Sequence, residues 1–80
     1  MNKKVIIYST PSCVYCNMAK AFFKDNAVKY DDRNVVTDEK SRDEMIQKSG
    51  QIGVPVIDIE GEIIIGFDKP AIVSLLGLKK

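Results

Sequence analysis

The sequence predicts one small α/β domain in which three helices flank a four-stranded mixed sheet. Three observations predict this fold class. Eighty residues suffice for a single domain, residues 1–80. Short β-branched apolar runs alternate with stretches of helical periodicity. The last two apolar runs are separated only by Glu60-Gly61, a hairpin turn signal. The predicted order is therefore βαβαββα, with parallel pairing from the opening crossovers and antiparallel pairing from the closing hairpin.

The first half of the chain contains two strands and one helix. Val5–Tyr8 is a β-branched apolar run that ends before Pro11, which predicts a short buried strand. A helix is predicted from Val14 to Asp25, with Asn26 as its C-terminal cap. Its expected buried face consists of the apolar residues at helical spacing, namely Val14, Met18, Ala19, Phe22 and Phe23. The more polar run of residues 29–35 predicts a second strand near an edge of the sheet.

The start of the second helix has two candidate signals. Thr37 is a good N-cap residue, and the acidic residues that follow it suit the first turn of a helix. Ser41 with Glu44 forms a competing capping box. The apolar face of this helix is thin, chiefly Met45 and Ile46, and Gly50 ends it.

The C-terminal part is predicted as a hairpin followed by a helix. Its strands are residues 54–59 and 62–65. Asp68 suits the N-cap of the last helix, Pro70 its first turn and Gly77 its end. The expected buried face of this helix comprises Ile72, Val73, Leu75 and Leu76.

Composition excludes several classes of function. Twelve basic and eleven acidic side chains leave a formal net charge of +1, which argues against nucleic-acid or anionic-membrane binding. The apolar run after Met1 is too short for a secretory signal, and no stretch reaches the length of a membrane span. We therefore expect a cytoplasmic monomer. Structural disulfides are rare in that compartment, so two cysteines indicate chemistry.

Cys13-Val14-Tyr15-Cys16 lies where the first strand gives way to the first helix. Unpaired backbone N–H groups and the helix dipole favour a thiolate at Cys13. Cys16 lies about one turn further on, close enough to bridge Cys13 and more sheltered. This arrangement suits thiol–disulfide exchange, in which Cys13 attacks a disulfide and Cys16 resolves the mixed disulfide. A C-x-x-C at such a corner of a βαβ chain is a strong redox signal.

Two other interpretations of the cysteines are possible. They can be buried, inert residues, or they can bind a metal. A closed zinc site usually needs four ligands, and the chain has two cysteines and no histidine, so no metal site is predicted. A copper(I) carrier with two thiolates is the remaining alternative. Such carriers usually have the order βαββαβ, which differs from the order predicted here.

Three segments of the chain resemble glutaredoxins. The first is Tyr8-Ser9-Thr10-Pro11-Ser12-Cys13-Val14-Tyr15-Cys16, followed by Ala19-Lys20; the others are Gly53-Val54-Pro55 and Gly66-Phe67-Asp68. The resemblance covers essentially the whole chain and is nearest to short bacterial glutaredoxin-like proteins close to the NrdH-redoxins. It implies the thioredoxin fold in its smallest form.

The resemblance also implies roles for residues outside the cysteine pair. The Val54–Pro55 bond is expected to be cis and to face the cysteines, so that the Val54 backbone can pair with an extended substrate. Tyr15 and Phe67 are expected to border a groove for glutathione or a client protein. Gly66 is expected to let the ligand approach the backbone, and Asp68 to add a secondary contact with a ligand amine.

The chain departs from the family at positions that bind glutathione. Many glutaredoxins have a lysine where this chain has Thr10 and a cation where it has Ile52. They usually have threonine at the position of Gly53 and an acidic residue at that of Lys69. Lys69 or Lys48 is a candidate substitute charge.

From sequence we therefore predict a dithiol–disulfide oxidoreductase that reduces protein disulfides or glutathione mixed disulfides. Glutathione is the expected co-substrate, and no bound cofactor is expected. The alternative within this class is an NrdH-like electron donor reduced by thioredoxin reductase.

Overall fold

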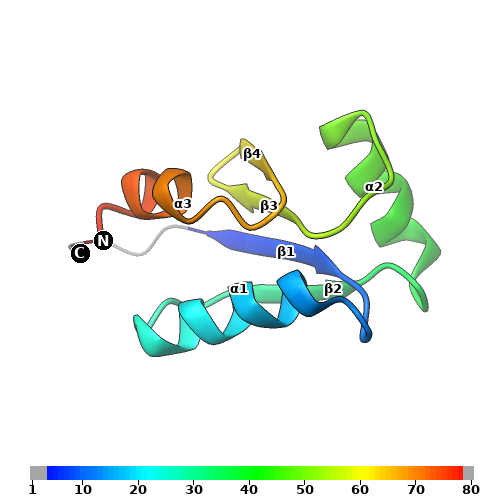
Figure 1. The fold of residues 1–80 in the computed structure, drawn as a ribbon. Coiled ribbons are helices and arrows are strands. Elements are labelled where there is room, and N and C mark those ends of the chain that lie inside the picture. Colours follow the sequence, from blue (N-terminus) through cyan, green and yellow to red (C-terminus); the bar gives the residue numbers. More distant parts are fainter. Residues whose placement is uncertain (1–3, 79–80) are drawn as a thin grey trace.

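The structure is a computed structural model that describes residues 4–78 (Figure 1). The predicted domain of residues 1–80 thus has three residues at one end and two at the other outside the described part. The elements follow the predicted order: β1 (Val5–Ser9), α1 (Val14–Asp25), β2 (Asp31–Asn34), α2 (Glu39–Ser49), β3 (Val56–Ile59), β4 (Glu62–Ile65) and α3 (Lys69–Leu76). No helix in this part of the chain is long and apolar enough to cross a membrane.

The four strands form one mixed sheet in the order β2-β1-β3-β4. β1 is parallel to β2 and antiparallel to β3, and β3 is antiparallel to β4. The predicted parallel pairing is confirmed for the first crossover, and the antiparallel hairpin and the edge position of β2 are confirmed too. The second crossover differs from the prediction, because the chain returns through α2 with β3 antiparallel to β1. In the hairpin, Glu60 and Gly61 both have positive φ, at 52° and 91°. Two such residues form the tight turn that matches the twist of an antiparallel pair.

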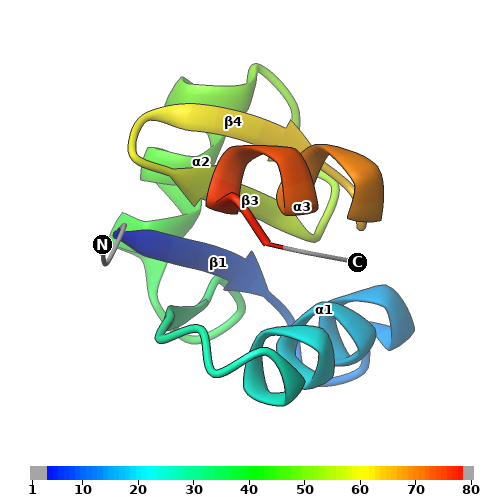
Figure 2. The same cartoon turned by 90° about the vertical axis from the view of Figure 1, so that its left-hand side faces the viewer.

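Alternate residues of the strands build a core on each face of the sheet. Figure 2 shows α1 and α3 in front of the strands and α2 behind them. Beneath α1 and α3, Ile7 and Ile57 pack with Phe23 and Ile72, all fully buried. Beneath α2 the buried residues are Ile6, Tyr8, Val35, Met45 and Val56. The β-branched runs are thus buried on both sides, as their unbroken hydrophobicity predicts.

The predicted starts of two elements are wrong. Asp38 caps α2, in place of Thr37 or Ser41. Its side chain accepts hydrogen bonds from the backbone N–H groups of Lys40 and Ser41 and from the Ser41 hydroxyl. A carboxylate outcompetes a hydroxyl here because it accepts from several donors and suits the positive end of the helix. β3 begins at Val56 rather than residue 54, since the proline before it cannot donate to the ladder.

The other predicted boundaries agree more closely. β2 is shorter than the predicted strand of residues 29–35. Asn26 caps α1, and Gly50 and Gly77 end α2 and α3 in the left-handed conformation. Asp68 caps α3 as predicted, accepting from the backbone N–H of Ala71.

The predicted buried faces of two helices need correction. In α1, Ala19 and Phe23 are buried and Phe22 lies at the edge of the core, but Val14 and Met18 are 67% and 46% exposed. They occupy the first turns, which lie beyond the cover of α3. In α3, Ile72 is fully buried and Leu75 and Leu76 are half-buried against the core. Val73 instead lines a shallow surface pocket with Lys69, Pro70 and Ser74.

Candidate active site at the start of the first helix

Cys13 is itself the N-cap of α1. Its backbone is extended, with φ −80° and ψ 115°, and its N–H donates to the carbonyl of Thr10 at 3.3 Å. Its Sγ accepts a hydrogen bond from the backbone N–H of Cys16 at 3.1 Å. An oxygen usually occupies this capping position. The Cys13 sulfur in that position accepts a helical N–H that has no partner within the helix, at the positive end of the helix dipole.

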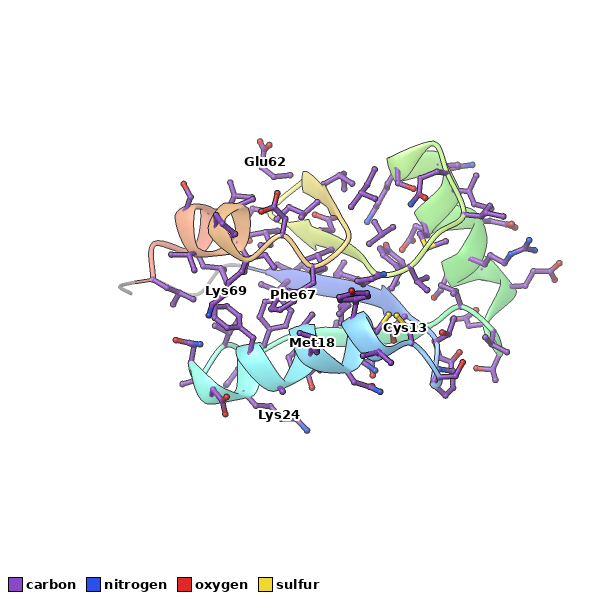
Figure 3. The ribbon with its side chains drawn as sticks, viewed as in Figure 1. Cys13, Met18, Lys24, Glu62, Phe67 and Lys69 are labelled. Atoms are coloured by element: carbon purple, nitrogen blue, oxygen red, sulfur yellow. The ribbon has the colours of Figure 1, made fainter. Side chains whose placement is uncertain are left out.

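The two cysteines differ in exposure. Figure 3 shows Cys13 at the first turn of α1, at the opposite end of the helix from Lys24. Cys13 is half-buried, whereas Cys16 is fully buried, and both are free thiols. Burial, and after it the interaction with the Cys13 side chain, raises the pKa of the Cys16 thiol to about 12. Cys16 is therefore protonated at neutral pH, and Cys13 is the sulfur that an external disulfide can reach.

The strand register gathers the remaining candidate residues at the same end of the sheet. The cysteine loop follows the end of β1, and Tyr8 pairs with Val56 at the start of β3. The Val54–Pro55 peptide bond, which is cis as predicted, directly precedes that strand. Gly66 follows β4, and its N–H donates to the carbonyl of Pro55 at 2.8 Å. Residues 13–16, 54–55 and 66–67 therefore lie at one end of the molecule.

The other predicted site residues differ in how they are held. Tyr15 is 62% exposed. Gly66 has φ 82°, which glycine adopts without strain, and the space around it is open. Phe67 is half-buried, with its ring 5.9 Å from that of Phe22, so it packs on the core as well as lying near the site. Asp68 is exposed and serves as the α3 cap. Their predicted contacts with a ligand stay predictions.

Comparisons with known proteins agree with this geometry. The family model of glutaredoxin matches residues 5–64. The chain belongs to the glutaredoxin family. It is 47% identical over 70 residues to an uncharacterized glutaredoxin-like 8.6 kDa protein in the rubredoxin operon of Clostridium pasteurianum, covering 88% of this chain and 93% of that one. It is 36% identical to glutaredoxin 3 of Escherichia coli over 64 residues, covering 80% and 77%.

Solved structures confirm the fold. A mutant of a thioredoxin-like protein superposes with a TM-score of 0.89 at 28% identity, covering 94% of this chain and 96% of that one. The predicted thioredoxin fold is thus confirmed. As a member of the glutaredoxin family, the chain is similar to thiol–disulfide oxidoreductases.

This glutaredoxin has a neutral surface around its cysteines. Residues 5–19, 49–57 and 63–67 contain no charged side chain, and Asp68, the exposed cap of α3, is the charged member of the predicted site residues. Both candidate substitute cations are engaged elsewhere. Lys48 is bonded to Asp58 at 2.7 Å on the α2 side, and the ammonium of Lys69 lies 5.3 Å from the centre of the Phe22 ring. Ile52, at a position where many glutaredoxins have a cation, is 66% exposed.

The sequence did not predict the hydrogen bonds that hold the loop before the cis proline. The side-chain amide of Gln51 donates to the Gly53 carbonyl at 3.0 Å and accepts from the Gly53 N–H at 2.9 Å. A Cβ on Gly53 would lie 2.8 Å from the Gln51 side-chain oxygen. The threonine usual in glutaredoxins at this position would therefore displace the flexible end of the Gln51 side chain and break its two hydrogen bonds with Gly53.

Two polar clusters were also missed, one on each face of the sheet. Beneath α1, Lys20, Asp32 and Ser9 are linked by an ion pair and a hydrogen bond. Beneath α2, the hydroxyl of the buried Tyr8 donates to Glu44 and accepts from Lys48. Burial raises the pKa of Tyr8. The spacing of Lys20, one turn after Cys16, was an available signal, but the partners of these residues are distant in sequence.

No group of three or more His, Cys, Asp or Glu side chains placed to hold a metal ion was found in residues 4–78.

Proposed function

We propose that this glutaredoxin reduces protein disulfides and glutathione mixed disulfides in the cytoplasm through a two-thiol cycle. The Cys13 thiolate attacks one sulfur of the substrate disulfide; the S–S bond breaks and the first substrate thiolate leaves. Cys16 then loses its proton and attacks the Cys13 sulfur. The second substrate thiolate leaves, and the Cys13–Cys16 disulfide forms. Two protons and two electrons pass to the substrate.

The single observation that supports this cycle is the asymmetric environment of the two sulfurs. Cys13 caps a helix and is partly exposed, whereas Cys16 is buried and donates its backbone N–H to the Cys13 sulfur at 3.1 Å. The exposure of Cys13 favours its reaction with an external disulfide, and the position of Cys16 beside the Cys13 sulfur favours intramolecular resolution.

The substrate side is proposed to accept a protein. Val14, Tyr15, Met18 and Ile52 are exposed hydrophobic side chains on or near the neutral segments around the cysteines. An apolar surface of this kind matches the uncharged surroundings of a protein disulfide better than it matches a charged tripeptide.

Glutathione is the proposed reductant of the Cys13–Cys16 disulfide. Its binding should be weak, because neither Thr10 nor Ile52 supplies a cation for its carboxylates. The same observation favours a second candidate function, in which thioredoxin reductase supplies the electrons as in the NrdH-redoxins.

Two parallel assays distinguish these reductants. The oxidised protein is given either glutathione with glutathione reductase or thioredoxin reductase, each with NADPH. We expect turnover with glutathione that saturates only at high glutathione concentration. Fast turnover with thioredoxin reductase and none with glutathione would replace the first candidate by the second. An absence of turnover in both assays, with a folded protein, would refute both candidate reductants.

A further inference from the structure

Lys20 lies on the buried side of α1, one turn after Cys16. Side chains four residues apart on a helix share a face. Cys16 is fully buried, and the side chain of Lys20 is only 19% exposed. Lys24, one further turn along, is exposed, and Figure 3 shows it pointing away from the sheet. Lysine is rarely sheltered without a partner, so the position of Lys20 calls for an explanation.

The partner of Lys20 comes from the neighbouring strand. Its Nζ lies 2.7 Å from Oδ2 of Asp32 in β2. The other oxygen of Asp32 accepts a hydrogen bond at 2.7 Å from the hydroxyl of Ser9, the buried last residue of β1. Asp32 pairs with Ile7, whose side chain belongs to the core beneath α1, so Asp32 projects toward α1. The ammonium of Lys20 is therefore held beneath α1 by an edge-strand carboxylate that is itself 41% exposed.

The groups that act on the Cys16 sulfur fall into two sets. Burial and the neighbouring Cys13 raise the pKa of Cys16, whereas the Thr10 backbone and the charge of Lys20 lower it. Lys20 is the cation in this set. Ser9, which anchors Asp32, is the residue directly before Thr10. The Lys20–Asp32–Ser9 cluster therefore includes the residue next to Thr10, whose backbone acts on the Cys16 sulfur.

We propose that Lys20 is a positioning residue for the resolving step, in which its ammonium, held by Asp32, stabilises the Cys16 thiolate as that sulfur attacks Cys13. The inference rests on the proposed two-thiol cycle. In this step Cys16 releases its proton to solvent and forms the Cys13–Cys16 bond. The bond between Cys13 and the substrate breaks, and the departing substrate thiolate takes up a proton.

The size of the effect follows from thiol chemistry. The charge of Lys20 is the smallest of the effects on Cys16, so its removal should raise the pKa of that thiol by about half to one unit and lower the thiolate fraction about three- to tenfold. The more basic thiolate is the better nucleophile, which offsets roughly half of this loss on a logarithmic scale. The resolving step should therefore slow about two- to threefold.

Ellman's reagent, an aromatic disulfide that releases a coloured thiolate, measures the two steps separately. Attack by Cys13 releases one equivalent of the coloured product, and attack by Cys16 on the mixed disulfide releases the second. Stopped-flow traces of wild type, Lys20→Met, Lys20→Arg and the matched control Lys24→Met are compared across pH, with circular dichroism to establish that each variant is folded.

We expect the second phase to slow about two- to threefold in Lys20→Met and its pH profile to move to higher pH. The first phase should be unchanged, Lys20→Arg should remain close to wild type, and Lys24→Met should match wild type. An unchanged second phase and pH profile in folded Lys20→Met would overturn the role of Lys20 while leaving the cycle intact. Equal slowing of both phases would also overturn it. A missing second phase in wild type would instead refute the two-thiol cycle.

Discussion

The raised pKa of Cys16 predicts a large difference between the two thiols in their reaction with iodoacetamide. At pH 8 a thiol with an ordinary pKa of about 8.5 is roughly one-quarter thiolate. Cys16, with a pKa of about 12, is about one part in ten thousand thiolate. The thiolate fraction of Cys16 is therefore about two thousand times smaller than that of the ordinary thiol. The higher nucleophilicity of the more basic thiolate recovers a factor of about 25 to 55. Cys16 in the native protein should therefore react about 40- to 80-fold more slowly than an ordinary thiol.

Burial makes that factor a lower bound, because Cys16 has no exposed surface. The reduced protein is alkylated for increasing times, digested, and the two cysteines are quantified by mass spectrometry. Cys13 should be labelled first and almost exclusively. In the Cys13→Ser variant the alkylation of Cys16 should remain slow, because this variant retains the burial that is the first cause of its raised pKa. In guanidinium chloride the two thiols should react at similar rates. Equal labelling of both thiols in the folded protein would refute the reasoning.

Three further predictions follow from the same contacts. Thr10→Lys combined with Ile52→Arg should tighten glutathione binding about tenfold, since one exposed charge-assisted hydrogen bond is worth about 1.5 kcal/mol; calorimetry should show the gain shrinking with salt. Because folding raises the pKa of Cys16, denaturant titrations should show stability falling as pH rises above about 8.5, a loss that Cys16→Ala lacks. Lys48→Met should cost about 1–3 kcal/mol of unfolding free energy, because the buried Asp58 loses its 2.7 Å partner; an unchanged midpoint in denaturant would contradict this.

Signals that depend on a few consecutive residues were predictable from the sequence. The strand-to-helix position of Cys13, the Glu60-Gly61 turn and the Asp68 cap each follow from local chemistry, and all three are present in the structure. The cis bond before Pro55 needed the resemblance as well, since the residues alone also permit a trans proline at the start of a strand.

What the sequence left undetermined depends on packing. Helical spacing placed Val14 and Met18 with the core of α1, but periodicity does not show how far a neighbouring helix extends, and both are exposed. The ion pair of Lys20 joins residues from different elements, and so does the bond between Lys48 and Asp58. Local patterns contain no information on such partners, so the electrostatic surroundings of Cys16 required the three-dimensional structure.

In the proposed cycle Cys13 attacks the substrate disulfide and Cys16 resolves the mixed disulfide. The most direct measurement is mass spectrometry, under non-reducing conditions, of Cys13→Ser and Cys16→Ser after each is mixed with a disulfide-containing client protein. Cys16→Ser should accumulate a covalent complex with the client through Cys13, and Cys13→Ser should form none. A covalent complex formed by Cys13→Ser through Cys16, or full protein-disulfide turnover by Cys16→Ser without a trapped complex, would contradict the account.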